Sequence, residues 1–109
     1  LVIEYPELKG IYCNNDTMAL GSIQALKRAG KLDEIIVVGT DGIETAIDAI
    51  QAGELSATVD IHPRQTGAIG LEVLARILHS QQVPPVVFVP QTLITRESTQ
   101  AGSSGVVNP

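Results

Sequence analysis

The segment IIVVGTDG, at residues 35–42, is the strongest structural signal in this chain. Its β-branched run is typical of a strand buried on both faces, as in a parallel sheet. The turn GTDG follows directly, so Asp41 is expected at the carboxyl end of this strand. Open α/β sheets bind ligands outside the carboxyl ends of their strands, which places Asp41 where a ligand would lie. Asp-Gly after a strand is also ordinary turn chemistry, and both interpretations stay open at this point.

A second junction of this kind lies at residues 10–21, GIYCNNDTMALG. A short apolar strand over 10–13 precedes a helix predicted over 16–29, which Gly30 ends. Asp16 is the predicted N-cap of that helix. Asn15 then lies at the carboxyl end of the strand. Its amide can donate and accept hydrogen bonds, whereas the carboxylate of Asp41 can only accept them.

The rest of the chain continues the alternation of strands and helices. Helices are predicted over 43–52 and 63–80, and strands over 55–59, 86–89 and 93–95. This order predicts an α/β fold, with a parallel sheet and flanking helices. Sheets of this type usually have more strands on each side, so the sequence indicates part of a larger sheet.

The composition limits the classes of protein to which this chain could belong. The 109 residues are 44% hydrophobic and 17% charged, which is typical of a globular chain, and the formal net charge is −5. No cluster of Lys and Arg is present, so nucleic-acid binding by this segment is not expected. No apolar run is long enough for a membrane helix, and the opening LVIEYP lacks the basic start of a signal peptide. Cys13 is the single cysteine, and we expect it to be a small buried core residue.

Residues that could carry catalysis or bind metal are sparse. His62 and His79 lie too far from other ligand types to form a metal site, and we expect His62 to be a solvated loop residue. The chain has no Gly-x-Ser-x-Gly motif for a hydrolase. GTDG also lacks the lysine pattern of a phosphate loop. The sequence therefore favours a binding protein over an enzyme, with no cofactor and no metal.

Four segments in a fixed order resemble the carboxy-terminal part of type I periplasmic binding proteins. They are IYCNNDTMALGSIQALKRAGK, IIVVGTDG, AGELSATVDIHP and VFVPQTLITRES, within about residues 5–98. Among these proteins, the chain looks most like the ribose-type sugar-binding proteins of ABC importers. The resemblance implies two lobes with a sugar between them. Residues 1–60 would then form a segment of the carboxy-terminal lobe, 61–98 a hinge crossing with elements of the other lobe and a return strand, and 99–109 a flexible tail.

The resemblance also implies site residues. Asn15 and Asp41 match family positions whose amide and carboxylate bind sugar hydroxyls. Ile61 occupies a hinge position where the family often has Gln, which suggests a different or deoxygenated sugar, or another polyol. Thr40 replaces a Phe that often precedes the acid. Aromatic residues make up only 3% of the chain, and none is expected at a strand end, so a ring that stacks on the sugar would come from the other lobe.

The function implied is the solute-binding component of an ABC importer, which presents a monosaccharide or related polyol to permease subunits. Such a protein would be periplasmic, or extracellular and tethered to the membrane. Two alternatives remain: the effector-binding domain of a lac-repressor-type transcription regulator, and a half-lobe that binds nothing. The isolated chain is expected to be either marginally stable or oligomeric, because the helix over 63–80 carries an apolar stripe that needs a partner.

Overall fold

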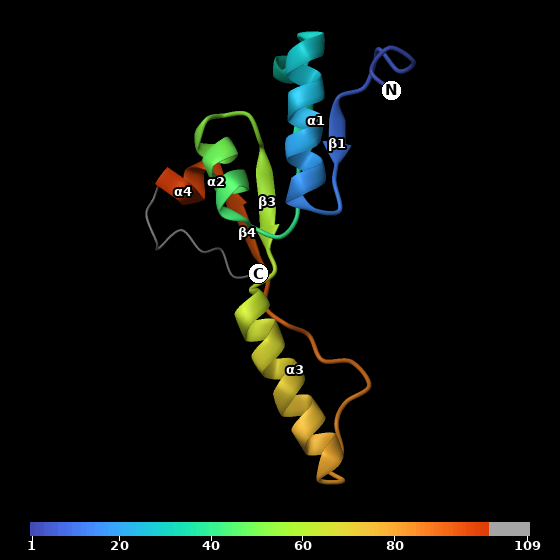
Figure 1. Ribbon diagram of the computed structural model, residues 1–109, viewed down its shortest axis with the longest axis vertical. Coiled ribbons are helices and arrows are strands. Elements are labelled where there is room, and N and C mark those ends of the chain that lie inside the picture. Colours follow the sequence, from blue (N-terminus) through green and yellow to red (C-terminus); the bar gives the residue numbers. More distant parts are fainter. Residues whose placement is uncertain (101–109) are drawn as a thin grey trace.

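The computed structural model describes residues 1–100. Figure 1 shows a sheet with helices alongside it in the upper part of the view and an arm that projects below, and the overall extents are 57 × 34 × 20 Å. The predicted flexible tail lies outside the described residues except at its start. At that start, Thr99 and Gln100 belong to a short helix, α4 (Arg96–Gln100).

The sheet has four strands in the order β1-β2-β3-β4. Their bounds are β1 Gly10–Tyr12, β2 Ile36–Val38, β3 Ala57–Asp60 and β4 Thr92–Thr95. β1 pairs with β2 and β2 with β3 in parallel, whereas β4 runs antiparallel beside β3. The expectation of an α/β fold is confirmed, with the correction that β4 makes the parallel sheet a mixed one.

Local chemistry explains where α1 ends and where α3 begins. They are α1 Asp16–Ala29, α2 Glu44–Gln51 and α3 Pro63–Leu78, with a 3-10 turn, η1, at Leu32–Glu34. α1 ends at Gly30, whose φ of 67° is the left-handed conformation that a helix C-cap needs. Pro63 opens α3, a position at which the missing N–H of proline costs nothing.

The core lies between one face of the sheet and helices α1 and α2. Its buried apolar residues are Cys13, Ala19, Ile23, Leu26, Ile35, Val37, Ala46, Ala49, Ile50 and Leu55. Cys13 is therefore the buried core residue that was predicted. The prediction that the 35–38 run is buried on both faces was wrong, because Ile36 is 59% exposed. Successive strand residues point to opposite faces, and helices of residues 1–100 cover only the face of Val37.

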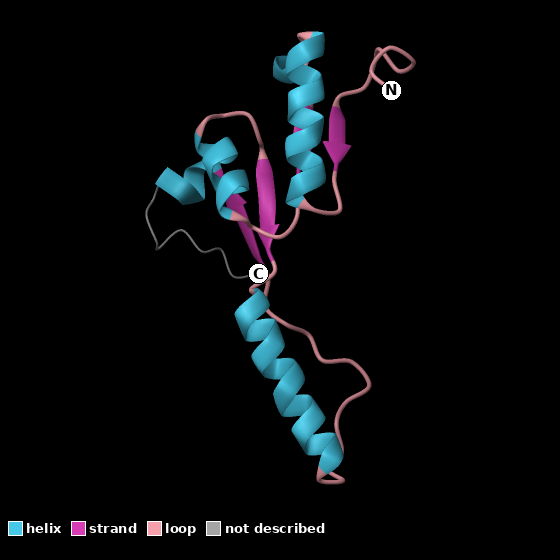
Figure 2. Ribbon diagram, in the orientation of Figure 1, coloured by secondary structure: helices cyan, strands magenta, loops and turns pink. Residues whose placement is uncertain are grey.

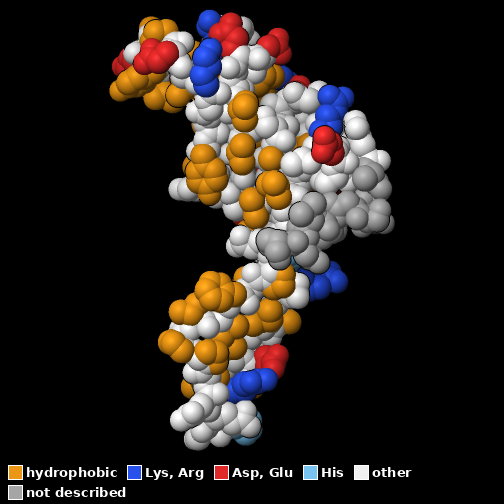
Figure 3. Space-filling view, turned by 180° about the vertical axis from the view of Figure 1, so that it is seen from behind, with side chains coloured by type: hydrophobic (Ala, Val, Ile, Leu, Met, Phe, Trp, Pro, Cys, Tyr) orange, Lys and Arg blue, Asp and Glu red, His pale blue; other side chains and the backbone are white. Residues whose placement is uncertain are grey.

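The projecting arm consists of α3 and the returning segment over 79–91 (Figure 2). The predicted strand over 86–89 is absent, because none of the four strands pairs with that segment. An apolar groove runs between α3 and this segment, lined in part by Ile69, Val73, Ile77, Val83 and Val87. Hydrophobic side chains cover much of the arm in Figure 3, and Phe88 is 89% exposed. The arm thus has no sheet to cover it within residues 1–100.

Candidate functional site

The carboxyl ends of the three parallel strands meet at one edge of the sheet. Tyr12 at the end of β1 pairs with Val38 at the end of β2. Beyond β2, Asp41 forms an isolated parallel bridge with Asp60, the last residue of β3. Asn15, Asp41 and Ile61 each follow one of these strands at this edge. The structure therefore places the three residues predicted from the sequence at the same edge.

Asn15 is the N-cap of α1. Its backbone is extended and its Oδ1 accepts a hydrogen bond of 2.9 Å from the Met18 N–H. This corrects the prediction that Asp16 caps the helix. The cap uses only the side-chain oxygen of Asn15, which is half-buried. The two N–H donors of the side-chain amide form no hydrogen bond within residues 1–100. Asn15 can therefore cap α1 and donate to a ligand simultaneously.

Asp41 has an unusual backbone. Its φ is 124°, a conformation that side chains other than glycine rarely adopt, and its N–H donates to the carbonyl oxygen of Val59 at 2.8 Å. The side chain is half-buried, and its carboxylate makes no hydrogen bond or ion pair within the described residues 1–100. Backbone strain of this kind is concentrated at functional sites. The carboxylate is thus held in position with its acceptors available.

Ile61 lies in the short crossing between β3 and α3. Its side chain is half-buried, and its carbonyl oxygen accepts a hydrogen bond of 2.9 Å from the Thr66 hydroxyl at the start of α3. Donor, acceptor and apolar surface are therefore offered at one edge by Asn15, Asp41 and Ile61. This combination suits a small, hydroxyl-rich ligand that also has C–H surface.

Tyr12 and Thr40 were not expected to interact. The Tyr12 hydroxyl lies 3.3 Å from Oγ1 of Thr40, and Oγ1 also donates to the carbonyl oxygen of Cys13 at 3.5 Å. These contacts join the ends of β1 and β2. The prediction that no aromatic residue lies at a strand end was wrong, because Tyr12 is the last residue of β1. Tyr12 lies near the end of the strand predicted over 10–13, so the sequence already indicated an aromatic residue at that strand end.

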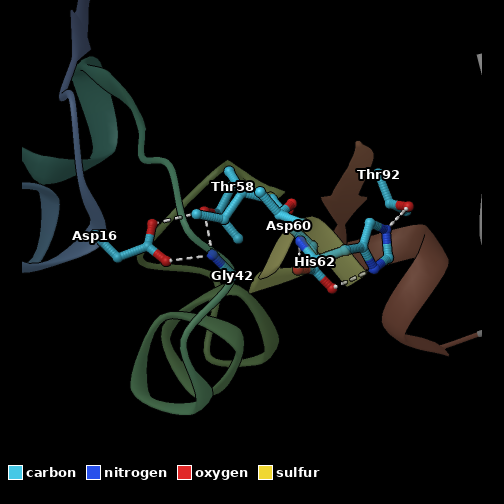
Figure 4. A network of polar contacts seen from close by, with 8 residues as sticks. Asp16, Gly42, Thr58, Asp60, His62 and Thr92 are labelled. Carbon is cyan, nitrogen blue, oxygen red and sulfur yellow. Dashed lines mark hydrogen bonds and ion pairs between the residues drawn. The ribbon is translucent and has the colours of Figure 1, made fainter. Parts of the chain in front are cut away.

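His62 is not the solvated loop residue that was expected. Its Nε2 lies 2.6 Å from Oγ1 of Thr92 in β4, and its backbone N–H donates to Oδ1 of Asp60 at 2.8 Å. The ring Nδ1 lies 3.6 Å from Oδ2 of Asp60. His62 therefore connects the strand that leaves the sheet with the strand that returns to it (Figure 4).

Asp16 is the residue that sequence reasoning missed. It is fully buried, and its Oδ2 accepts hydrogen bonds from the N–H groups of Gly42 at 2.8 Å and Ile43 at 3.0 Å. Its Oδ1 accepts from the Thr58 hydroxyl at 2.6 Å. Figure 4 shows this network, which joins α1, the turn after β2 and β3. Only the fold brings positions 16, 42 and 58 together, so sequence reasoning had no local signal for it.

Within residues 1–100, no group of three His, Cys, Asp or Glu side chains is arranged to hold a metal ion. None of the described helices is both long and apolar enough to span a bilayer.

The described residues form an α/β unit with a polar edge at the carboxyl ends of its parallel strands. The periplasmic binding protein domain family matches residues 2–82. The chain is 44% identical over 86 residues to the D-allose-binding periplasmic protein of Escherichia coli, across 79% of this chain and 28% of that protein. It is 36% identical over 97 residues to the ribose import binding protein of Salmonella typhimurium, across 89% of this chain and 32% of that protein.

A comparison with solved structures also finds a periplasmic binding protein. The ABC transporter periplasmic solute binding protein from Actinobacillus succinogenes with bound D-allose superposes with a TM-score of 0.79 and 30% identity, across 92% of this chain and 35% of that chain. This chain belongs to the periplasmic binding protein family. It spans about a third of the length of these relatives. All three are binding proteins by name.

Proposed function

We propose that this chain is the carboxy-terminal part of the solute-binding component of an ABC importer, which binds a monosaccharide or related polyol in a cleft between two lobes. The observation that carries the proposal is the meeting of Asn15, Asp41 and Ile61 at the carboxyl edge of the sheet. The binding functions in the names of the relatives support it. The full-length protein would work in the periplasm, or outside the cell on a membrane tether, and would present its ligand to permease subunits.

The path of the chain supports a division into lobes. Residues 1–60 form a segment of the carboxy-terminal lobe, and residues 61–98 form the crossing, elements of the other lobe and the return strand. Support comes from the pairing of Asp60 with Thr92 and from the contact between His62 and Thr92, which put the two crossings side by side. Paired crossings of this kind form a hinge, and a ligand that contacts both lobes would favour the closed form.

Each site residue has a separate role. The Asn15 amide nitrogen donates to a sugar hydroxyl oxygen, and the Asp41 carboxylate accepts from one or two hydroxyl groups. Ile61 lies against a C–H surface of the ring, at a position without a hydrogen-bonding group. The ligand is therefore a monosaccharide or polyol that presents an apolar patch toward the hinge.

Calorimetric titration of the full-length protein with D-allose, ribose and sugar alcohols tests this function. Saturable binding of at least one of them is expected, and Asp41→Ala should weaken it. Asp48→Ala is the matched control, because Asp48 is an exposed acid on α2 and makes no side-chain contact at the edge. Absence of binding to every sugar and polyol would overturn the proposal, as would equal affinity for the Asp41 variant. Uptake of the labelled ligand by cells with and without the protein tests the permease step.

A further inference from the structure

The buried carboxylate of Asp16 has no cationic partner among residues 1–100. A buried carboxylate is costly unless donors satisfy it, and here two backbone N–H groups and one hydroxyl do so. Both N–H groups, those of Gly42 and Ile43, precede α2, whose N-cap Ile43 offers no side-chain acceptor. Asp16 therefore holds the turn that leads into α2 and is also the first residue of α1.

The turn that Asp16 contacts is the one that carries Asp41. Asp41 has a φ of 124° and Gly42 a φ of 77°. A Cβ atom on Gly42 would lie 2.9 Å from Cα of Asp60, so only glycine fits there. Strained backbone persists where surrounding contacts determine it. Here the contacts are the Asp41 N–H to Val59 on one side and the two N–H groups bound by Asp16 on the other.

We propose that Asp16 is a positioning residue for ligand binding, which selects the strained Asp41-Gly42 turn and thereby sets the direction of the Asp41 carboxylate. The inference rests on the proposed function of Asp41. Without Asp16, the turn would exchange with relaxed conformers whose carboxylate points elsewhere. The apparent dissociation constant then rises in inverse proportion to the fraction of molecules whose turn stays competent.

Thr58 extends this argument to a second residue. It is fully buried in β3, its hydroxyl donates to Asp16 Oδ1, and its Oγ1 accepts from the Gly42 N–H at 3.3 Å. Thr58→Val removes both contacts and keeps the shape of the side chain. Thr58→Ser keeps the hydroxyl and serves as its matched control.

The test compares Asp16→Asn and Thr58→Val in the full-length protein. Asparagine keeps the shape of Asp16 and one acceptor oxygen, and loses the negative charge and the second acceptor. We expect both variants to bind D-allose or ribose about tenfold more weakly, which corresponds to a competent turn in about a tenth of the molecules. Thr58→Ser should bind like the wild type. Ile23→Val, on the buried face of α1, lowers stability without touching the turn and should leave affinity unchanged.

A double-mutant cycle separates positioning from a general structural role. If Asp16 acts through Asp41, Asp16→Asn should lose affinity in the wild-type background and change little in the Asp41→Ala background. In the ligand-free protein, the amide protons of Gly42 and Ile43 should also exchange faster with solvent in Asp16→Asn and in Thr58→Val. This readout requires no ligand and remains informative if one of the variants fails to fold.

The outcomes distinguish the two proposals. If Asp41→Ala weakens binding and neither Asp16→Asn nor Thr58→Val does, the positioning role is refuted and the proposed function stands. Equal losses in both backgrounds of the cycle, or unchanged amide exchange, likewise refute it. If Asp41→Ala leaves affinity unchanged, the proposed function itself fails.

Discussion

Gly39 lies where the fold leaves no room for a side chain. A Cβ atom at this position would lie 2.2 Å from Oδ1 of Asp16 and 3.2 Å from Cβ of Ala19. The Ala19 contact is with a buried residue of α1, which cannot move without shifting the helix. In Gly39→Ala the carboxylate of Asp16 must therefore leave its place and give up at least one of its three hydrogen bonds.

The size of the effect follows from two terms. Forcing an extra methyl group into a packed interior costs about 1–3 kcal/mol. Loss of one hydrogen bond to a charged group adds about 1.5–3 kcal/mol. We therefore expect the free energy of unfolding of Gly39→Ala to fall by about 2.5–6 kcal/mol, a large share of the roughly 5–15 kcal/mol that a folded domain has. Urea titration of the full-length protein, followed by circular dichroism, measures this loss.

Gly21→Ala is the matched control. Gly21 is exposed in the middle of α1, and a Cβ atom there would meet nothing within 4 Å. The same substitution should stabilise the protein by about 0.5–1 kcal/mol, because alanine is the better helix former. If Gly39→Ala costs less than about 1 kcal/mol while Gly21→Ala shows its gain, the carboxylate of Asp16 does not occupy the buried position described.

Three further results are expected. Asp41→Ala should reduce ligand affinity by about 1.5–3 kcal/mol, the scale of a hydrogen bond to a charged group, and calorimetry that shows no change would exclude Asp41 from the site. Ile61→Gln should shift preference toward more hydroxylated sugars, and a ligand-bound structure with Ile61 away from the ligand would contradict this. The 109-residue chain alone should associate through the apolar face of α3, where Leu71 is 70% and Leu78 74% exposed. Light scattering after size-exclusion chromatography tests that expectation, and a monomer at all concentrations would refute it.

The elements with strong local signals could be predicted from the sequence. α1 and α3 appear within two residues of their predicted bounds, because apolar spacing, Gly30 and Pro63 mark them. The predictions that failed depend on distant partners. A strand over 86–89 needs a neighbour to pair with, and burial of Ile36 needs a layer on the second face of the sheet. An apolar run predicts that a segment is buried, but it does not predict which element covers that segment.

The location of the candidate site residues at one edge of the sheet could be predicted from the sequence, whereas the hydrogen bonds around them could not. The strand ends placed Asn15 and Asp41 at one edge, because parallel strands share a direction. Asn15 and Asp16 are equally suited to cap α1, so local chemistry could not assign the cap between them. The long-range bonds from Asp16 to Gly42 and Thr58 decide the assignment. His62 was misjudged for the same reason, because its partner Thr92 lies 30 positions away.

The hydrogen bonds that Asn15 and Asp41 can offer also indicate why the proposed site needs further binding groups. Asn15 and Asp41 together offer about 2–4.5 kcal/mol in net hydrogen-bond free energy, if the amide bond is neutral and the other is to a charged group. Association of a ligand costs roughly 4–15 kcal/mol in lost freedom, so these two groups cannot hold a sugar alone. If the proposed function holds, the remaining free energy would come from groups of the other lobe, which a ligand would reach only when the lobes close. A ligand held in this way favours the closed form by its contacts on both sides, and the paired crossings at Asp60 and Thr92 are the place where that closure would turn.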